Sequence, residues 1–139
     1  DFWFDPQFNL IEDFDFFTRV CYEWELGYVD SIQAKYRIHE NSFTFIQRNN
    51  FSVEYKILIN KYIKIIPEFT QLYKKQIYCL NRIIDWLDAQ ALARNGSFKK
   101  ASKKIKQYSF DSIKWFAKFL LISLPFIRKL FVKKLLNRI

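Results

Sequence analysis

The sequence predicts a mostly α-helical fold with a small α/β portion near its beginning. Apolar residues recur every three or four positions over residues 11–24 and over most of residues 51–139, which is the period of an amphipathic helix. Between these stretches, Tyr28-Val29 and Ala34–His39 have the composition of short strands around a polar turn at Asp30-Ser31. Residues 1–46 hold nine acidic and three basic residues, whereas residues 47–139 hold five acidic and twenty basic ones. Two regions with different roles are therefore expected.

The first expected helix begins at Ile11, after a loop that contains the turn signal Asp5-Pro6. Acidic residues fill its first turn, where they oppose the positive end of the helix dipole. Gly27 is expected to end this helix. Its apolar positions recur at helical spacing and comprise Phe14, Phe17, Cys21 and Trp24.

Two helices separated by a proline are expected next. Phe51–Ile66 forms the first, and Pro67 ends it or occupies the first position of the second. The second helix runs from about Pro67 to Arg94. Its predicted apolar face comprises Leu72, Ile77, Leu80, Ile84, Leu87 and Ala91.

The end of the chain is also expected to be helical. Asn95-Gly96-Ser97 ends the long helix and caps a short one from Phe98 to about Gln107. Ser109 is expected to cap a last helix, which is kinked at Pro125 and continues to the C-terminus.

The composition indicates a cytoplasmic protein without a membrane-spanning helix. Cys21 and Cys79 lie far apart in the sequence without the spacing of metal ligands, so we expect reduced thiols packed in the core. The longest nearly apolar run, Trp115–Ile127, contains Lys118 and is shorter than the roughly 20 residues that a spanning helix needs.

An ordered series of short motifs occupies the first 45 residues. Phe4-Asp5-Pro6 is followed by Glu12-Asp13-Phe14-Asp15 and Arg19, then by Gly27-Tyr28, and then by a segment that begins Tyr36-Arg37 and continues through His39 to Ser42. This order resembles the acceptor half of a family 2 glycosyltransferase, in which an F-D-x-x-F segment leads into an E-D-x-D-L-x-x-R helix and a Y-R-x-H-x-x-S strand end follows. Phe16 stands where leucine is usual and keeps that position apolar.

The resemblance implies a GT-A fold and an inverting transfer of a sugar from a nucleotide-sugar donor to a hydroxyl acceptor. It also implies that Asp13 is the general base that takes the acceptor proton. Glu12 and Asp15 then have supporting roles, and Asp15 is placed to pair with Arg19 four residues later. The alternative is that all three acids only solvate the start of a helix.

The resemblance further places Arg37 and His39 near the donor diphosphate. His39 is the only histidine and is a candidate ligand for Mn²⁺ or Mg²⁺ in the full-length enzyme. The alternatives are a packed or hydrogen-bonded histidine and a surface arginine.

The donor-binding half of such an enzyme is not recognisable in the sequence. No Asp-x-Asp metal motif precedes the Glu12 helix, and the chain begins at Asp1 without any methionine. We therefore expect a fragment: residues 1–49 form the acceptor-side part of a GT-A catalytic domain, and residues 50–139 form a basic helical region. Alone, it is expected to be inactive and to need no cofactor. The full-length enzyme would use a nucleotide-sugar donor and a glycan or lipid-linked acceptor, in the synthesis of a surface polysaccharide or glycoconjugate.

The basic end of the chain suggests a second partner. Its last helix is expected to carry an apolar stripe flanked by lysines and arginines, as in helices that lie on the inner face of the plasma membrane and are attracted to anionic lipids. Packing of the stripe on residues 51–94 is the alternative. Nucleic acid is not expected, because no recognition motif is present and residues 1–46 are acidic. The alternative to a transferase is a non-catalytic, membrane-peripheral helical protein. The stripe comprises Ile113, Phe116, Leu120, Leu124, Ile127, Phe131 and Leu135.

Overall fold

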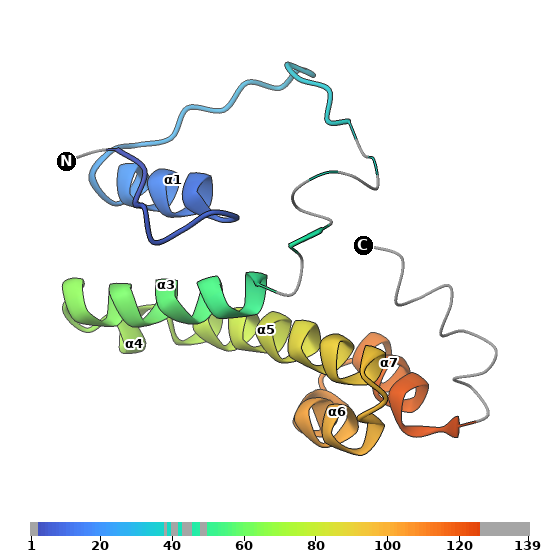
Figure 1. Cartoon of the computed structure of the whole chain (residues 1–139). Helices are drawn as coiled ribbons and strands as arrows, with labels where there is room; N and C mark the ends of the chain where they lie inside the picture. The colour runs from blue at the N-terminus through green and yellow to red at the C-terminus, as the bar shows by residue number, and fades with distance from the viewer. Residues whose placement is uncertain (1–2, 38, 40–41, 43–45, 48–49, 126–139) are drawn as a thin grey trace. The chain divides into compact units, whose positions relative to one another are not determined.

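A computed structural model of the chain describes residues 3–37, 39, 42, 46–47 and 50–125. The described part is mostly helical, which confirms the mostly α part of the predicted class (Figure 1). Its helices are α1 (Glu12–Glu23), α3 (Phe51–Ile65), α4 (Phe69–Leu72), α5 (Lys74–Arg94), α6 (Phe98–Ile105), the 3-10 helix η1 (Lys106–Tyr108) and α7 (Ile113–Ser123). The chain divides into two compact units, Asp1–Lys61 and Tyr62–Ile139, and the division falls within α3.

In the first unit, α1 packs through a different face from the one that the sequence pattern suggests. Ile11 and Asp15 are buried, whereas Phe14, Phe17 and Trp24 of the predicted apolar stripe are exposed. Cys21 is a free, exposed thiol, so the expectation of a core-packed cysteine is wrong there. The helix buries its polar side because charged residues of α3 provide ionic partners for it.

The two predicted strands are absent from the described residues. Residues 27–37 and 39 contain no strand, and the side chains of that segment are exposed. Two short strands are marginal without a further strand or helix to cover them, and the exposure of residues 27–37 and 39 shows that no described strand or helix covers this segment. Gly27 does not end α1 either: the helix ends at Glu23, and Trp24 is already extended.

In the second unit, the predicted helix from Pro67 to Arg94 is divided in two. Ile65 ends α3, two residues before Pro67, and Glu68 takes a left-handed conformation with φ of 56°. The short α4 then ends at Leu72, and the backbone departs from helical geometry at Tyr73 before α5 begins. Proline removes a backbone donor and so favours the first break.

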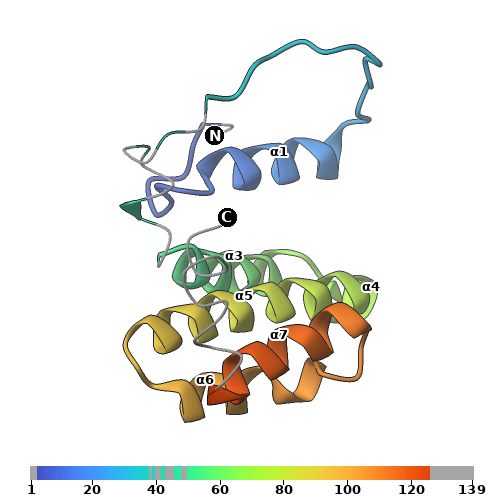
Figure 2. The same cartoon turned by 90° about the vertical axis from the view of Figure 1, so that its right-hand side faces the viewer.

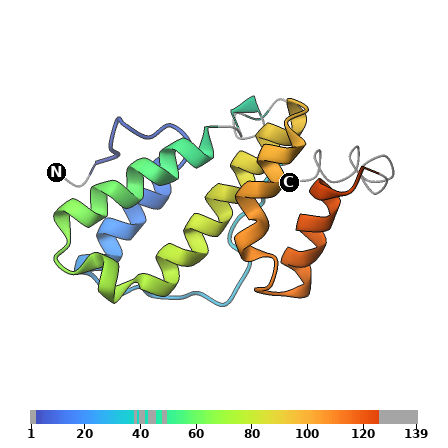
Figure 3. The same cartoon turned by 90° about the horizontal axis from the view of Figure 1, so that it is seen from below.

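Helices α5, α6 and α7 of this unit share one hydrophobic core. Figures 2 and 3 show α6 turning back along α5 and α7 turning back along α6. Small residues let α5 and α6 approach closely, because Ala89, Ala93 and Ala101 are almost completely buried. Larger residues fill the rest of this core: Trp86, Ile105, Tyr108, Trp115 and Ile122.

The last helix begins and packs differently from the prediction. Ser112, not Ser109, is its N-cap, and its side chain accepts a hydrogen bond from the Trp115 amide at 3.4 Å. The buried residues of α7 are Trp115 and Ile122, whereas Ile113 of the predicted stripe is 84% exposed. The helix ends at Ser123, before Pro125. The rest of the stripe, from Ile127 onward, lies outside the described residues.

Candidate active site

The start of α1 is held by a carboxylate from α3. Glu54 is buried, and its oxygens accept hydrogen bonds from the amides of Asn9, Leu10 and Ile11 at 3.0–3.3 Å. The first amides of a helix have no partner within the helix, and the helix dipole favours a negative charge beside them. From a distant part of the sequence, Glu54 therefore fixes the three residues that lead into α1, including its N-cap residue Ile11.

Asp15 is the most deeply buried acid of the predicted motif. Its side chain is fully buried, and its two oxygens receive Arg19 Nε at 3.0 Å and Lys61 Nζ at 2.8 Å. A buried carboxylate is costly unless it is paired and hydrogen-bonded, and both conditions are met here. The predicted pairing of Asp15 with Arg19 is thus confirmed.

Lys61 joins the loop before α1 to the same network. Its ammonium group lies 2.7 Å from Asp5 Oδ2 and 5.3 Å from the centre of the buried Phe8 ring. The hydrogen bond from Lys61, aided by one from the Gln7 amide, lowers the pKa of Asp5. Arg19 also binds the segment before α1, because it donates a hydrogen bond to the Trp3 carbonyl at 2.7 Å.

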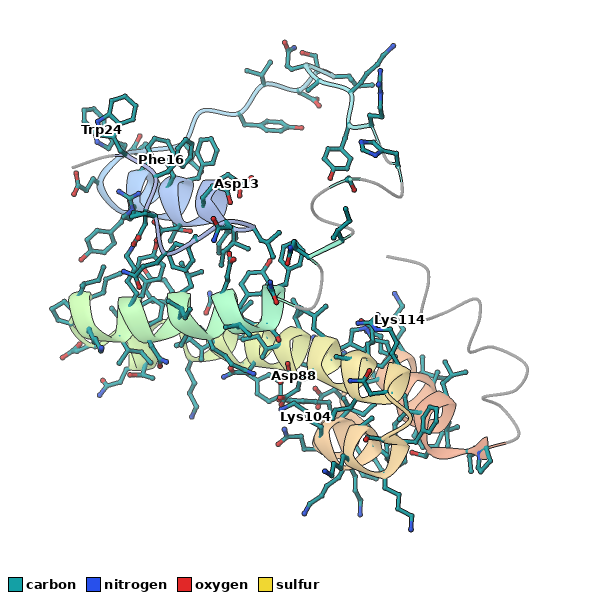
Figure 4. All side chains as sticks on the ribbon, in the orientation of Figure 1. Asp13, Phe16, Trp24, Asp88, Lys104 and Lys114 are labelled. Carbon is teal, nitrogen blue, oxygen red and sulfur yellow. The ribbon has the colours of Figure 1, made fainter. Side chains whose placement is uncertain are left out.

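Asp13 differs from Asp15 in its surroundings. Its side chain is exposed at the beginning of α1, with Phe16 and Trp24 further along the chain (Figure 4). Oδ1 accepts a hydrogen bond from the Phe14 amide at 2.7 Å. Burial, and to a smaller extent the nearby Asp13 charge, raises the pKa of the Tyr55 hydroxyl. Asp13 thus lies beside the first turns of α3, with its carboxylate open to solvent.

Glu12 has an intermediate position. The residue is partly buried, and its Oε2 atom has no hydrogen-bond partner among the described residues. Glu12 and Asp13 are therefore the two acids of the motif that the buried ion network does not use.

Arg37 and His39 are exposed on the extended segment that follows α1. The carbonyl of His39 accepts a hydrogen bond from the Ser42 amide at 3.1 Å, whereas no described contact joins either side chain to the acids of α1. Within the described part of the chain, no group of three or more His, Cys, Asp or Glu side chains could hold a metal ion.

Sequence reasoning missed Glu54 and Lys61. Both lie on the face of α3 that also carries the buried Leu58, at spacings of four and three residues. Two charges that interrupt an apolar face are a signal of buried ion pairs. That signal could have identified them as partners of another charged element.

Comparison with models of protein families, with curated proteins and with solved structures finds no match.

Proposed function

We propose that this chain supplies the acceptor side of an inverting glycosyltransferase, with Asp13 as the general base. The observation that supports this proposal is that the acids of α1 differ in burial and in ion pairing. Asp15 is fixed by Arg19 and Lys61, whereas Asp13 is exposed two residues earlier on the same helix. A base must reach a substrate hydroxyl, so only an acid outside the ion network can serve.

The proposed step is a single displacement. The acceptor hydroxyl gives its proton to the Asp13 carboxylate while its oxygen forms a bond to the anomeric carbon of the donor. The bond from this carbon to the nucleoside diphosphate breaks on the opposite face, which inverts the configuration. The buried network keeps the start of α1 rigid, and a fixed geometry is what proton transfer requires.

The donor side of the site belongs to the proposed full-length enzyme. Arg37 and His39 are proposed to approach the donor diphosphate there. A single exposed histidine does not make a divalent-metal site, because such ions bind several oxygen ligands. In the proposed step this chain therefore contributes the Asp13 carboxylate and no metal site, and Mn²⁺ or Mg²⁺ stays a prediction for the full-length enzyme.

Replacement of Asp13 tests the proposal in the full-length enzyme. Asp13→Asn should preserve donor binding and lower turnover by about 10²–10⁴-fold, the usual contribution of a general base. Glu23→Gln is the matched control, because it removes one exposed negative charge from the other end of α1. Turnover close to normal in Asp13→Asn would remove this residue from the mechanism.

The reading frame that precedes Asp1 separates the transferase from the alternative. A donor-binding half with an Asp-x-Asp motif supports the transferase. A start codon directly before Asp1 instead supports a non-catalytic helical protein.

A further inference from the structure

The outward face of α6 and η1 is a continuous basic stripe. Burial follows the helical period, because Ala101, Ile105, Tyr108 and Ser109 are buried. Of the positions between them, Lys103, Lys106 and Gln107 are exposed. The side chains of α6 that end in nitrogen project mainly away from α5, whereas Lys104 points toward Asp88 (Figure 4). The stripe comprises the exposed residues Lys99, Lys100, Lys103 and Lys106.

The acidic residues near this stripe form ion pairs and hydrogen bonds with residues outside it. Lys104 lies 2.9 Å from Asp85 and 3.1 Å from Asp88, and Tyr108 also donates to Asp85 at 2.8 Å. Asp111 accepts from Arg82 at 3.0 Å and from the Tyr78 hydroxyl at 2.8 Å. The four lysines of the stripe make no ion pair with a described acid, so their charge is available to an anionic partner.

The stripe ends in exposed apolar side chains. Phe110 lies in the turn that follows η1, four residues after Lys106, and it is 92% exposed. Ile113, at the start of α7, is 84% exposed. Burial of these side chains in an apolar phase would be favourable.

We propose that the lysine stripe, with Phe110 and Ile113 at its end, binds the surface of an anionic membrane. The ammonium groups would lie at the level of the lipid phosphates, and the two apolar side chains would enter the boundary with the acyl chains. Basic side chains beside exposed apolar ones are the usual composition of such interfacial surfaces. A soluble polyanion would use the lysines but would leave Ile113 in water.

The test measures binding of the full chain to lipid vesicles by cosedimentation. Vesicles of phosphatidylcholine are compared with vesicles that also contain phosphatidylserine, at low and high salt. We expect binding only to the anionic vesicles. High salt should weaken it without abolishing it, because salt screens the lysines but does not affect apolar insertion.

Two double variants locate the surface. Replacing Lys100 and Lys103 with Glu should weaken binding by about 25-fold or more, since each basic residue near such a surface contributes roughly fivefold. The matched control replaces Lys74 and Lys75 with Glu; these residues are exposed at the start of α5, remote from α6. It should change binding by less than about threefold.

A third variant tests insertion. Phe110→Ser should lower the salt-resistant binding about tenfold, because it removes an apolar side chain of ordinary burial energy. Circular dichroism verifies that each variant retains its helices.

Three outcomes would overturn the proposal. The first is equal binding to neutral and anionic vesicles. The second is an equal loss of binding in the two double variants. Unchanged binding after replacement of Lys100 and Lys103, together with a loss after replacement of the C-terminal residues Lys129, Lys133 and Lys134 with Glu, would have the same meaning. The third is binding that high salt abolishes and that Phe110→Ser leaves unchanged, which would indicate a soluble polyanion. None of these measurements depends on sugar transfer, so they are independent of the proposed transferase.

Discussion

The ion network of Asp5, Asp15, Arg19 and Lys61 connects two segments that are more than 40 residues apart in the sequence. Lys61 is central to it, because its single ammonium group contacts both acids. Such a network favours the observed packing of α1 on α3, since it satisfies both carboxylates. It also fixes the helix on which Asp13 is placed.

Loss of Lys61 should therefore be costly. Lys61→Met keeps most of the side-chain volume but leaves the fully buried Asp15 with one cation fewer, and the free energy of unfolding should fall by about 3 kcal/mol. Urea unfolding followed by Trp fluorescence measures this change. Lys64→Met, at an exposed position in the last turn of α3, should stay within about 0.5 kcal/mol of the unmodified chain. A similar effect of the two variants would show that the network does not stabilise the fold.

At the scale of the element, the end of α5 shows how one residue type determines a boundary. Gly96 has φ of 75°, its amide donates to the Ala93 carbonyl at 3.0 Å, and the Ser97 amide donates to the Leu92 carbonyl at 2.8 Å. These two bonds form a Schellman motif, which needs a residue in the left-handed region. The turn directs α6 back along α5 and so forms the core of the second unit.

Gly96→Ala should lower the free energy of unfolding by about 1 kcal/mol, because alanine is strained at this φ. Gly27→Ala is the control: it has open space around it and no left-handed φ, so the change should be neutral or slightly stabilising. Thermal unfolding of the two variants measures the difference. Equal effects would mean that the turn does not need glycine.

The helices whose boundaries lie in local sequence could be predicted, and those that depend on distant partners could not. The period of the apolar residues predicts the helix after Asn50 and the short helix from Phe98, and Pro67 predicts the end of the first of these. Gly96 predicts the end of α5. By contrast, the buried face of α1 is decided by Glu54 and Lys61, whose contacts are non-local. The prediction of two strands around Asp30 was wrong for the same reason. A strand needs a neighbouring strand to pair with, and the local sequence pattern does not show whether one is present.

In the whole molecule, the prediction of the site was likewise limited to contacts between residues close in sequence. The pair Asp15–Arg19 could be predicted because it is local, with a spacing of four residues on one helix. The sequence could not show that Asp13 is exposed while Asp15 is buried, since both are acids of the same helix turn.

No helix in the part of the chain that the structure describes is long and apolar enough to cross a membrane.

This chain alone is expected not to bind a nucleotide sugar. A helix N-terminus is a common site for phosphate, but the amides before α1 already bind the Glu54 carboxylate. The described residues also contain no group of acids and histidine that could hold a metal ion for a diphosphate. Titration calorimetry of the full chain with UDP-sugars and Mn²⁺ should show no heat above that of dilution. Micromolar binding would instead mean that the chain forms a donor site of its own, and the acceptor-side proposal would fail.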